Sequence, residues 1–123
     1  LGDVYKRQDL FSSDARIKVG DMHKMPFEDN QFDLLYSCHS LEHSYDIKVA
    51  LTEFVRVLRP QSMMAIEVPY MLPEAVNIYD RWALQSAEDV TKHIDGFIDE
   101  VVYSDVNEDR MRLLIKIKKP QHS

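Results

Sequence analysis

Two aspartates stand beside predicted strands, where carboxylates can bind a nucleoside. Asp9 precedes a short apolar pair, and Asp21, followed by Met22, comes after the apolar piece at residues 17–19. In an open α/β sheet, the residues that follow the strands gather around one crevice. A carboxylate there can accept hydrogen bonds from both ribose hydroxyls, and a second carboxylate followed by a free N–H can recognise adenine. A lone aspartate is more typical of a turn, but the set in this order predicts a nucleoside site.

A cysteine and two histidines follow the next predicted strand. Cys38 and His39 end an apolar run, and His39, Glu42 and His43 have the spacing H-x-x-E-H. On a helix the two imidazoles could share a face and bind zinc, with the glutamate as base. The group directly follows a buried strand, however. We therefore favour a structural role, with Leu41 in the core and Glu42 and His43 holding the loop by hydrogen bonds, and predict no metal site.

The hydrophobic pattern predicts the elements that position these residues. Residues 32–37 are nearly all apolar, which is typical of a strand buried on both faces. Helical spacing then predicts a helix that is capped by Asp46 and stopped by Pro60. Residues 63–68 predict another buried strand. The apolar stripe of the helix consists of Ile47, Ala50, Leu51, Phe54, Val55 and Leu58.

The rest of the chain predicts one short helix and a hairpin. Ser86 and Asp89 have the spacing of a capping box, which predicts a helix over residues 87–94. Residues 98–103 and 111–118 predict two strands joined by a polar connection. The order strand, strand, helix, strand, helix, strand, strand predicts an α/β sheet with an antiparallel edge.

Three stretches carry a family resemblance. Residues 20–35 contain Gly20-Asp21 and then M-P-F-E-D-N-Q-F-D, and resemble the G-D-x strand end and L-P-F-x-D-x-S-F-D of class I S-adenosylmethionine-dependent methyltransferases of the type 11 group. Residues 39–43 resemble the L-E-H element of that group, and residues 51–60 resemble its helix ending in R-V-L-(K/R)-P-G-G. Gln61 and Ser62 stand where the group has Gly-Gly. The resemblance covers residues 9–68 well.

The resemblance implies a Rossmann-like methyltransferase sheet, mostly parallel with an antiparallel carboxy-terminal hairpin, that lacks the first strand, its Gly-rich loop and its helix. It implies that Asp21 and the Met22 N–H contact the adenine of S-adenosylmethionine and that Asp9 binds the ribose. Cys38 and His39 would lie beside the sulfonium and its methyl group. Some methyltransferases that use Mg²⁺ have E-x-x-E-H here, whereas this chain has His39 at the first position.

The function implied is methyl transfer to a small-molecule acceptor, with this stretch alone expected to be inactive. His39 or His43 would act as a general base if the acceptor must lose a proton. The alternative is a noncatalytic Rossmann-like module that binds a nucleotide or a protein. A Gly-rich loop encoded upstream would favour the enzyme.

Composition limits the class of protein further. A net charge of −6 without a basic stripe argues against nucleic-acid or membrane partners, and a single cysteine fits the reducing cytoplasm. Residues 1–8 resemble a translated sequencing adapter, so we expect an artificial leader there, a methyltransferase domain over 9–119 and a tail at 120–123.

Overall fold

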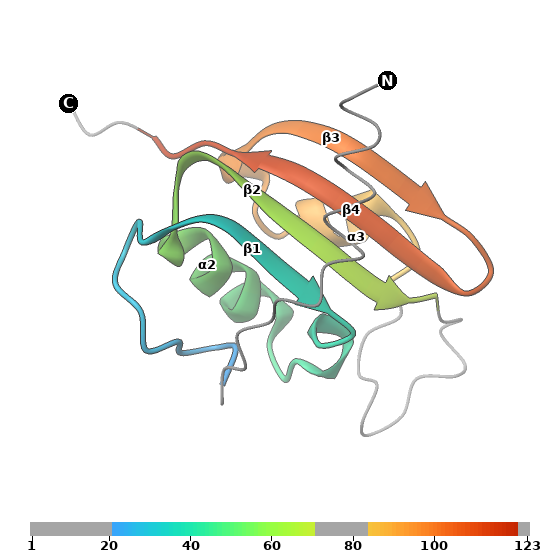
Figure 1. Ribbon diagram of the computed structural model, residues 1–123. Coiled ribbons are helices and arrows are strands. Elements are labelled where there is room, and N and C mark those ends of the chain that lie inside the picture. Colours follow the sequence, from blue (N-terminus) through green and yellow to red (C-terminus); the bar gives the residue numbers. More distant parts are fainter. Residues whose placement is uncertain (1–20, 71–83, 121–123) are drawn as a thin grey trace.

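The computed structural model describes residues 21–70 and 84–120 (Figure 1). Their strands form one four-stranded sheet in the order β1-β2-β4-β3. Asp9, the strand expected at residues 17–19 and the proposed leader at 1–8 lie outside the described residues. The elements are β1 (Phe32–Cys38), the 3₁₀ helix η1 (Leu41–His43), α2 (Ile47–Val57), β2 (Leu58–Pro69), α3 (Ala87–Thr91), the 3₁₀ helix η3 (Asp95–Phe97), β3 (Ile98–Val106) and β4 (Arg110–Ile117).

The described sheet is mixed. β1 and β2 are parallel, as expected for strands joined through a helix, whereas β4 is antiparallel to both β2 and β3. The predicted carboxy-terminal hairpin is therefore confirmed. One of the three strand pairs is parallel, so the described part is a mixed sheet. The mostly parallel sheet expected for the whole domain would include further strands that lie outside the described residues.

Helix α2 begins as predicted and ends earlier than predicted. The Asp46 carboxylate accepts a hydrogen bond from the Val49 N–H at 3.1 Å, which caps the first turn. The helix ends at Val57, and β2 starts at Leu58, so Pro60 lies within a strand and does not stop the helix. Gln61, in place of the family's glycine, takes the left-handed conformation with φ 67°.

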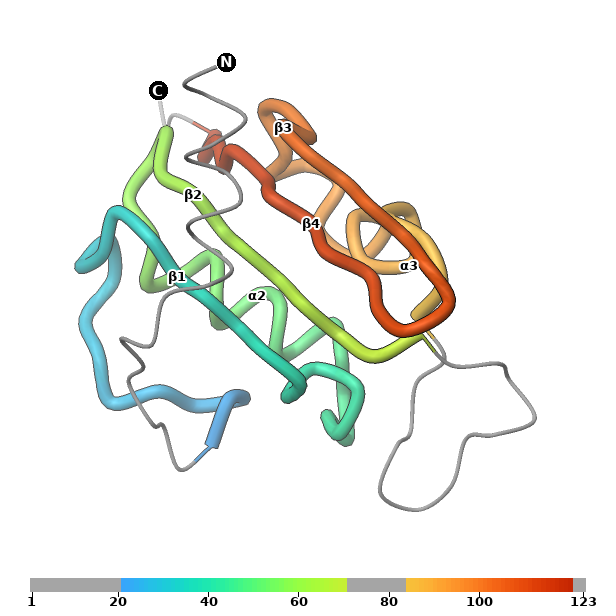
Figure 2. The backbone as a smooth tube through the Cα atoms, turned by 45° about the vertical axis from the view of Figure 1, so that its right-hand side comes forward, coloured from blue at the N-terminus to red at the C-terminus, as the bar shows by residue number. Residues whose placement is uncertain are grey.

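The two faces of the sheet differ in chemistry. Helices α2 and α3 lie against one face (Figure 2), where the buried core includes Leu51, Phe54, Ile66, Leu113 and Ile115. The opposite face has only a small apolar cluster around Ala65 and Leu114 within the described ranges. Strand alternation places the side chains of Cys38, Glu67 and Arg112 on this second face.

Helix α3 is shorter than the 87–94 helix expected from sequence. It ends at Thr91, and the chain continues through η3 to β3. The predicted capping box between Ser86 and Asp89 is confirmed. The Asp89 carboxylate accepts hydrogen bonds from the N–H groups of Ser86 and Gln85 at 3.2 and 2.9 Å. The apolar side chains of Val90 and Ile94 are buried against the sheet. None of the helices in residues 21–70 and 84–120 is long and apolar enough to span a membrane.

Candidate active site

Asp21 lies in a tight turn that its own carboxylate stabilises. Asp21 Oδ1 accepts hydrogen bonds from the His23 N–H and from His23 Nδ1, both at 2.9 Å. These two bonds, the backbone one first, lower the pKa of Asp21 and keep it ionised. Its side chain is half exposed, whereas neighbouring Met22 packs partly against the core. The carboxylate is thus both a turn former and accessible to a ligand.

His23 ties this turn to the loop that follows β1. Its Nε2 lies 2.6 Å from Ser44 Oγ, and its ring stacks on Tyr45 with the ring centroids 3.7 Å apart. The Asp21 carboxylate can only accept, so Nδ1 donates to it, and in the Nδ1–H tautomer Nε2 accepts from the Ser44 hydroxyl. The link holds the Asp21 turn beside the segment that contains His39 and His43, although the two segments are distant in sequence.

The chain of contacts Asp21–His23–Ser44 has the connectivity of a hydrolase triad, but it cannot act as one. Ser44 is completely buried, so no substrate carbonyl can reach its hydroxyl. Ser44 Oγ also accepts a hydrogen bond from the Asp46 N–H at 3.1 Å. The three residues therefore position the turn and the start of α2.

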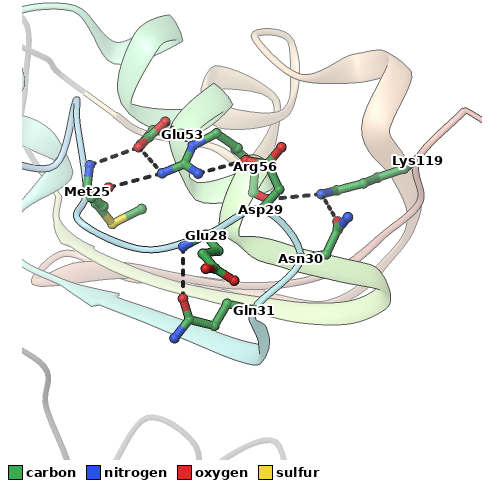
Figure 3. A network of polar contacts seen from close by, with 8 residues as sticks. All are labelled: Met25, Glu28, Asp29, Asn30, Gln31, Glu53, Arg56 and Lys119. Atoms are coloured by element: carbon green, nitrogen blue, oxygen red, sulfur yellow. Dashed lines mark hydrogen bonds and ion pairs between the residues drawn. The ribbon is translucent and has the colours of Figure 1, made fainter.

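A second network holds the segment between the Asp21 turn and β1 (Figure 3). Arg56 on α2 binds both Glu53 carboxylate oxygens, at 2.8 and 2.6 Å, and the Met25 carbonyl at 3.1 Å. Its third contact is Asp29 Oδ1 at 2.8 Å. Glu53 also accepts from the Met25 N–H at 2.8 Å, and the Arg56 hydrogen bond lowers the pKa of Glu53. Lys119 closes the network by donating to Asn30 and to the Arg56 carbonyl.

The ends of β1 and β2 meet around a buried carboxylate. Glu67 accepts from Arg112 Nε at 2.6 Å through Oε1, and its Oε2 lies 3.4 Å from Cys38 Sγ and 3.0 Å from His39 Nε2. Burial of Glu67 favours the protonated acid, but the hydrogen bonds from Arg112 and Cys38 outweigh it and lower the Glu67 pKa. We call Cys38, His39, Glu67 and Arg112 the Glu67 cluster.

The backbone directs His39 toward this carboxylate. His39 has φ 52°, a left-handed conformation that is uncommon for a residue with a side chain. Its N–H donates to the Glu67 carbonyl at 2.8 Å, which fixes the turn at the end of β1. The imidazole is about half exposed, with a side-chain exposure of 53%. A ring that donates Nε2–H to a carboxylate presents the basic Nδ1 to solvent, so His39 can act as a proton acceptor.

The H-x-x-E-H segment does not form the zinc arrangement that its spacing permits. Only residues 41–43 are helical, as one 3₁₀ turn, and His39 lies outside it. Leu41 is fully buried in the core, as favoured from sequence. His43 Nε2 lies 3.6 Å from Glu42 Oε2, which is too long for a hydrogen bond. Among the described residues, the group whose ligand atoms converge is Cys38, His39 and Glu67.

Sequence reasoning missed His23, Ser44, Glu67 and Arg112. A glutamate inside the apolar run of residues 63–68 and an arginine inside the apolar run of residues 111–115 were the available signals. Each charge alone could face solvent at a strand end. The register of β2 with β4 pairs Glu67 directly with Arg112, and the register of β1 pairs it with Cys38.

A hollow of about 610 Å³ lies elsewhere, beside the starts of β1 and β2. It is lined by Asp29, Asn30, Arg56, Pro60, Gln61, Phe97, Lys119 and Pro120. Parallel sheets bind ligands at the carboxyl ends of their strands. This hollow is at the opposite end of the strands and is lined by residues of the Arg56 network. We therefore place the candidate site at the Asp21 turn and the Glu67 cluster.

The chain is similar in sequence to known methyltransferases. The sequence profile of the "Methyltransferase domain" family matches residues 3–66, just over half of the chain. A ubiquinone/menaquinone biosynthesis C-methyltransferase of Brucella canis is 32% identical over 82 residues, which cover 65% of this chain and 30% of that protein. A sterol 24-C-methyltransferase of Gibberella zeae is 30% identical over 63 residues, covering 51% of this chain and 17% of that protein. The chain thus spans less than a third of the length of either relative.

Solved structures show the same fold. An S-adenosylmethionine-dependent methyltransferase from Aquifex aeolicus superposes with a TM-score of 0.61 at 17% identity, over 92% of this chain and 60% of that one. The mixed sheet described above is therefore a Rossmann-like methyltransferase sheet. Profile match, sequence order of the motifs and fold together show that the chain belongs to the methyltransferase domain family.

Proposed function

We propose that the protein binds S-adenosylmethionine and transfers its methyl group to a small-molecule acceptor. The observation that supports this best is the His23–Ser44 hydrogen bond of 2.6 Å. It joins the turn proposed to read adenine to the loop that follows β1 and begins at His39. The proposed contacts are Asp21 and the Met22 N–H with adenine, Asp9 with the ribose, and Cys38 and His39 with the sulfonium end.

The chemistry would consist mainly of positioning. The methyl group of a sulfonium is already activated, so in-line displacement needs the acceptor atom held close and aligned. S-adenosylmethionine supplies the methyl group and the leaving thioether. His39 would take a proton where the acceptor must lose one, because Glu67 orients its ring and its side chain is half exposed. His43 is the second candidate base.

The two curated relatives named above support a small organic acceptor. One is named for a sterol and the other for ubiquinone/menaquinone biosynthesis, and both are C-methyltransferases. Neither name extends to the acceptor of this protein, because acceptor choice depends on variable loops and fold does not define substrate.

The adenine assignment can be tested in a whole domain with its upstream segment restored. Asp21→Asn keeps an oxygen that can accept from the His23 N–H, so the turn should persist while the negative charge is lost. We expect a modest loss of S-adenosylmethionine affinity in Asp21→Asn and a larger loss in Asp21→Ala, measured by calorimetry. Asp33→Asn is the matched control, since Asp33 is an exposed carboxylate that binds Arg59.

Unchanged affinity in Asp21→Ala, with the melting temperature unaltered, would make Asp21 a turn former only. Binding without methyl transfer to any small acceptor would instead favour the alternative, a noncatalytic Rossmann-like module that binds a nucleotide or a protein. The genomic sequence upstream of Asp9 separates the two readings as well. A Gly-rich loop there supports the enzyme, because its backbone N–H groups would hold the methionine end of the cofactor.

A further inference from the structure

The Glu67 cluster has the composition of a metal site and lies where β1 and β2 end. Cys38 Sγ, His39 Nε2 and Glu67 Oε2 all lie within 4.8 Å of one another. We propose that these three atoms bind one Zn²⁺ ion and leave a fourth position open. This site goes beyond methyl transfer and shares only His39 with the H-x-x-E-H group. When Nε2 of His39 is bound to zinc, Nδ1 carries the proton, so the base for methyl transfer would be His43.

The spacing of the three atoms fits a tetrahedral zinc ion. Zinc bonds of about 2.3 Å to sulfur and about 2.0–2.1 Å to nitrogen and oxygen give edges of about 3.5 Å for S···O and about 3.3 Å for N···O. The corresponding separations are 3.4 Å between Cys38 and Glu67 and 3.0 Å between His39 and Glu67. Zinc would take the places of the Cys38 thiol proton and the His39 Nε2 proton in these two contacts. The third pair of ligand atoms, Cys38 Sγ and His39 Nε2, lies within 4.8 Å.

A second layer of contacts already orients two of the three ligands. Arg112 Nε donates to Glu67 Oε1, which leaves Oε2 to coordinate the ion. Tyr36 forms a hydrogen bond with the Cys38 side chain. Donors to the unused carboxylate oxygen and to a thiolate are the contacts that tune zinc sites.

Ligand chemistry selects zinc over the hard cations. A set of thiolate, imidazole and one carboxylate suits zinc, whereas magnesium and calcium prefer all-oxygen sites. Binding would release the Cys38 thiol proton to solvent, and the His39 proton would move from Nε2 to Nδ1, which frees the Nε2 lone pair for the ion. Three protein ligands leave a position for water or for a heteroatom of another molecule, and the half-exposed His39 side chain shows that solvent reaches this side.

The test uses cobalt as a spectroscopic substitute for zinc. Cys38 is the single cysteine of the chain, so a thiolate-to-cobalt charge-transfer band in the near ultraviolet can arise only from it. Titrating the reduced 123-residue chain with Co²⁺ should produce this band with one ion per chain, and Zn²⁺ should abolish it by displacement. Cys38→Ser should lose the band, and Glu67→Gln and His39→Ala should weaken binding strongly.

Two further variants distinguish a built site from general metal affinity. Tyr36→Phe should weaken zinc binding by about 10–100-fold while the band persists, because it removes only a second-layer donor. His43→Ala is the matched control, as its ring is nearby and similarly exposed, and should bind as the unaltered chain does. Circular dichroism verifies that each variant is folded. The proposal is overturned if the band is absent in excess Co²⁺, or if metal binding survives Cys38→Ser and Glu67→Gln. Neither result tests S-adenosylmethionine binding, which is measured separately.

Discussion

Replacing Arg56 tests whether the network in Figure 3 stabilises the segment that leads from the Asp21 turn to β1. Arg56→Met keeps an unbranched side chain and good helix propensity but removes every donor of the guanidinium. The lost contacts are the paired bonds to Glu53, one bond to the Met25 carbonyl and one to Asp29.

The expected cost follows from the exposure of each partner. Asp29 is 71% exposed, so its pair with Arg56 contributes less than about 1 kcal/mol. Glu53 is only 13% exposed, and losing its paired bonds and the Met25 carbonyl bond should cost about 2 kcal/mol. We therefore expect the free energy of unfolding to fall by about 2–3 kcal/mol. Each kcal/mol lost should lower Tm by roughly 4 °C for a domain of this size.

Urea denaturation at neutral pH measures this loss, and Arg59→Met is the matched control. Arg59 is 48% exposed and pairs with Asp33, which is 82% exposed, so its replacement should cost less than about 0.5 kcal/mol. Hydrogen exchange at the Met25 N–H should also become faster, because Glu53 loses the partner that orients it. Equal losses in Arg56→Met and Arg59→Met would refute the reasoning.

The effect of Arg56 should also depend on pH. Arg56 lowers the pKa of Glu53 in the folded chain. Its contribution is therefore fully present above the unfolded pKa of about 4.3 and is lost as pH falls through the lower folded value. The stability difference between the unaltered chain and Arg56→Met should shrink below about pH 4. A difference that stays constant into acid would mean that packing, and not the ion pair, is responsible.

Four other predictions follow from single features. Leu41→Ala should lower the unfolding free energy by about 2–4 kcal/mol in urea denaturation, because its side chain is fully buried; a loss below about 1 kcal/mol would place Leu41 outside the core. Gln61→Gly should stabilise the chain by about 0.5–1 kcal/mol, since φ is 67° there, and a loss of stability would contradict the assigned strain. Glu67→Gln should make the free energy of unfolding less dependent on pH between about pH 5 and 3, because the lowered Glu67 pKa means that only the ionised carboxylate stabilises the folded chain. An unchanged dependence of the unfolding free energy on pH in this range would contradict the prediction. The 123-residue chain alone should bind S-adenosylmethionine weakly or not at all in calorimetry, and micromolar binding would show that the Gly-rich loop is dispensable.

Local pattern was sufficient to predict most elements. The helical stripe and the Asp46 cap lie within one element, so their spacing alone predicts α2. The alternation of residues 111–118 likewise predicts β4. The end of α2 was predicted wrongly because Pro60 is a strong stop signal, whereas the chain leaves the helix at Val57 so that β2 can pair with β1.

The sequence by itself determined the family, the order of the described elements from β1 onward, and the positions of Cys38 and His39 at the end of β1. Only the tertiary structure decided which side chains meet there. Glu67 and Arg112 are 45 residues apart, and His23 and Ser44 are 21 apart. The Glu67–Arg112 pair depends on strand register, and a shift of one residue would move each side chain to the other face of the sheet. The His23–Ser44 contact depends on how the turn at residues 21–23 packs against the loop after η1. Spacing within a motif carries no information on that register, so the H-x-x-E-H pattern could not indicate that Cys38 and His39 lie beside Glu67.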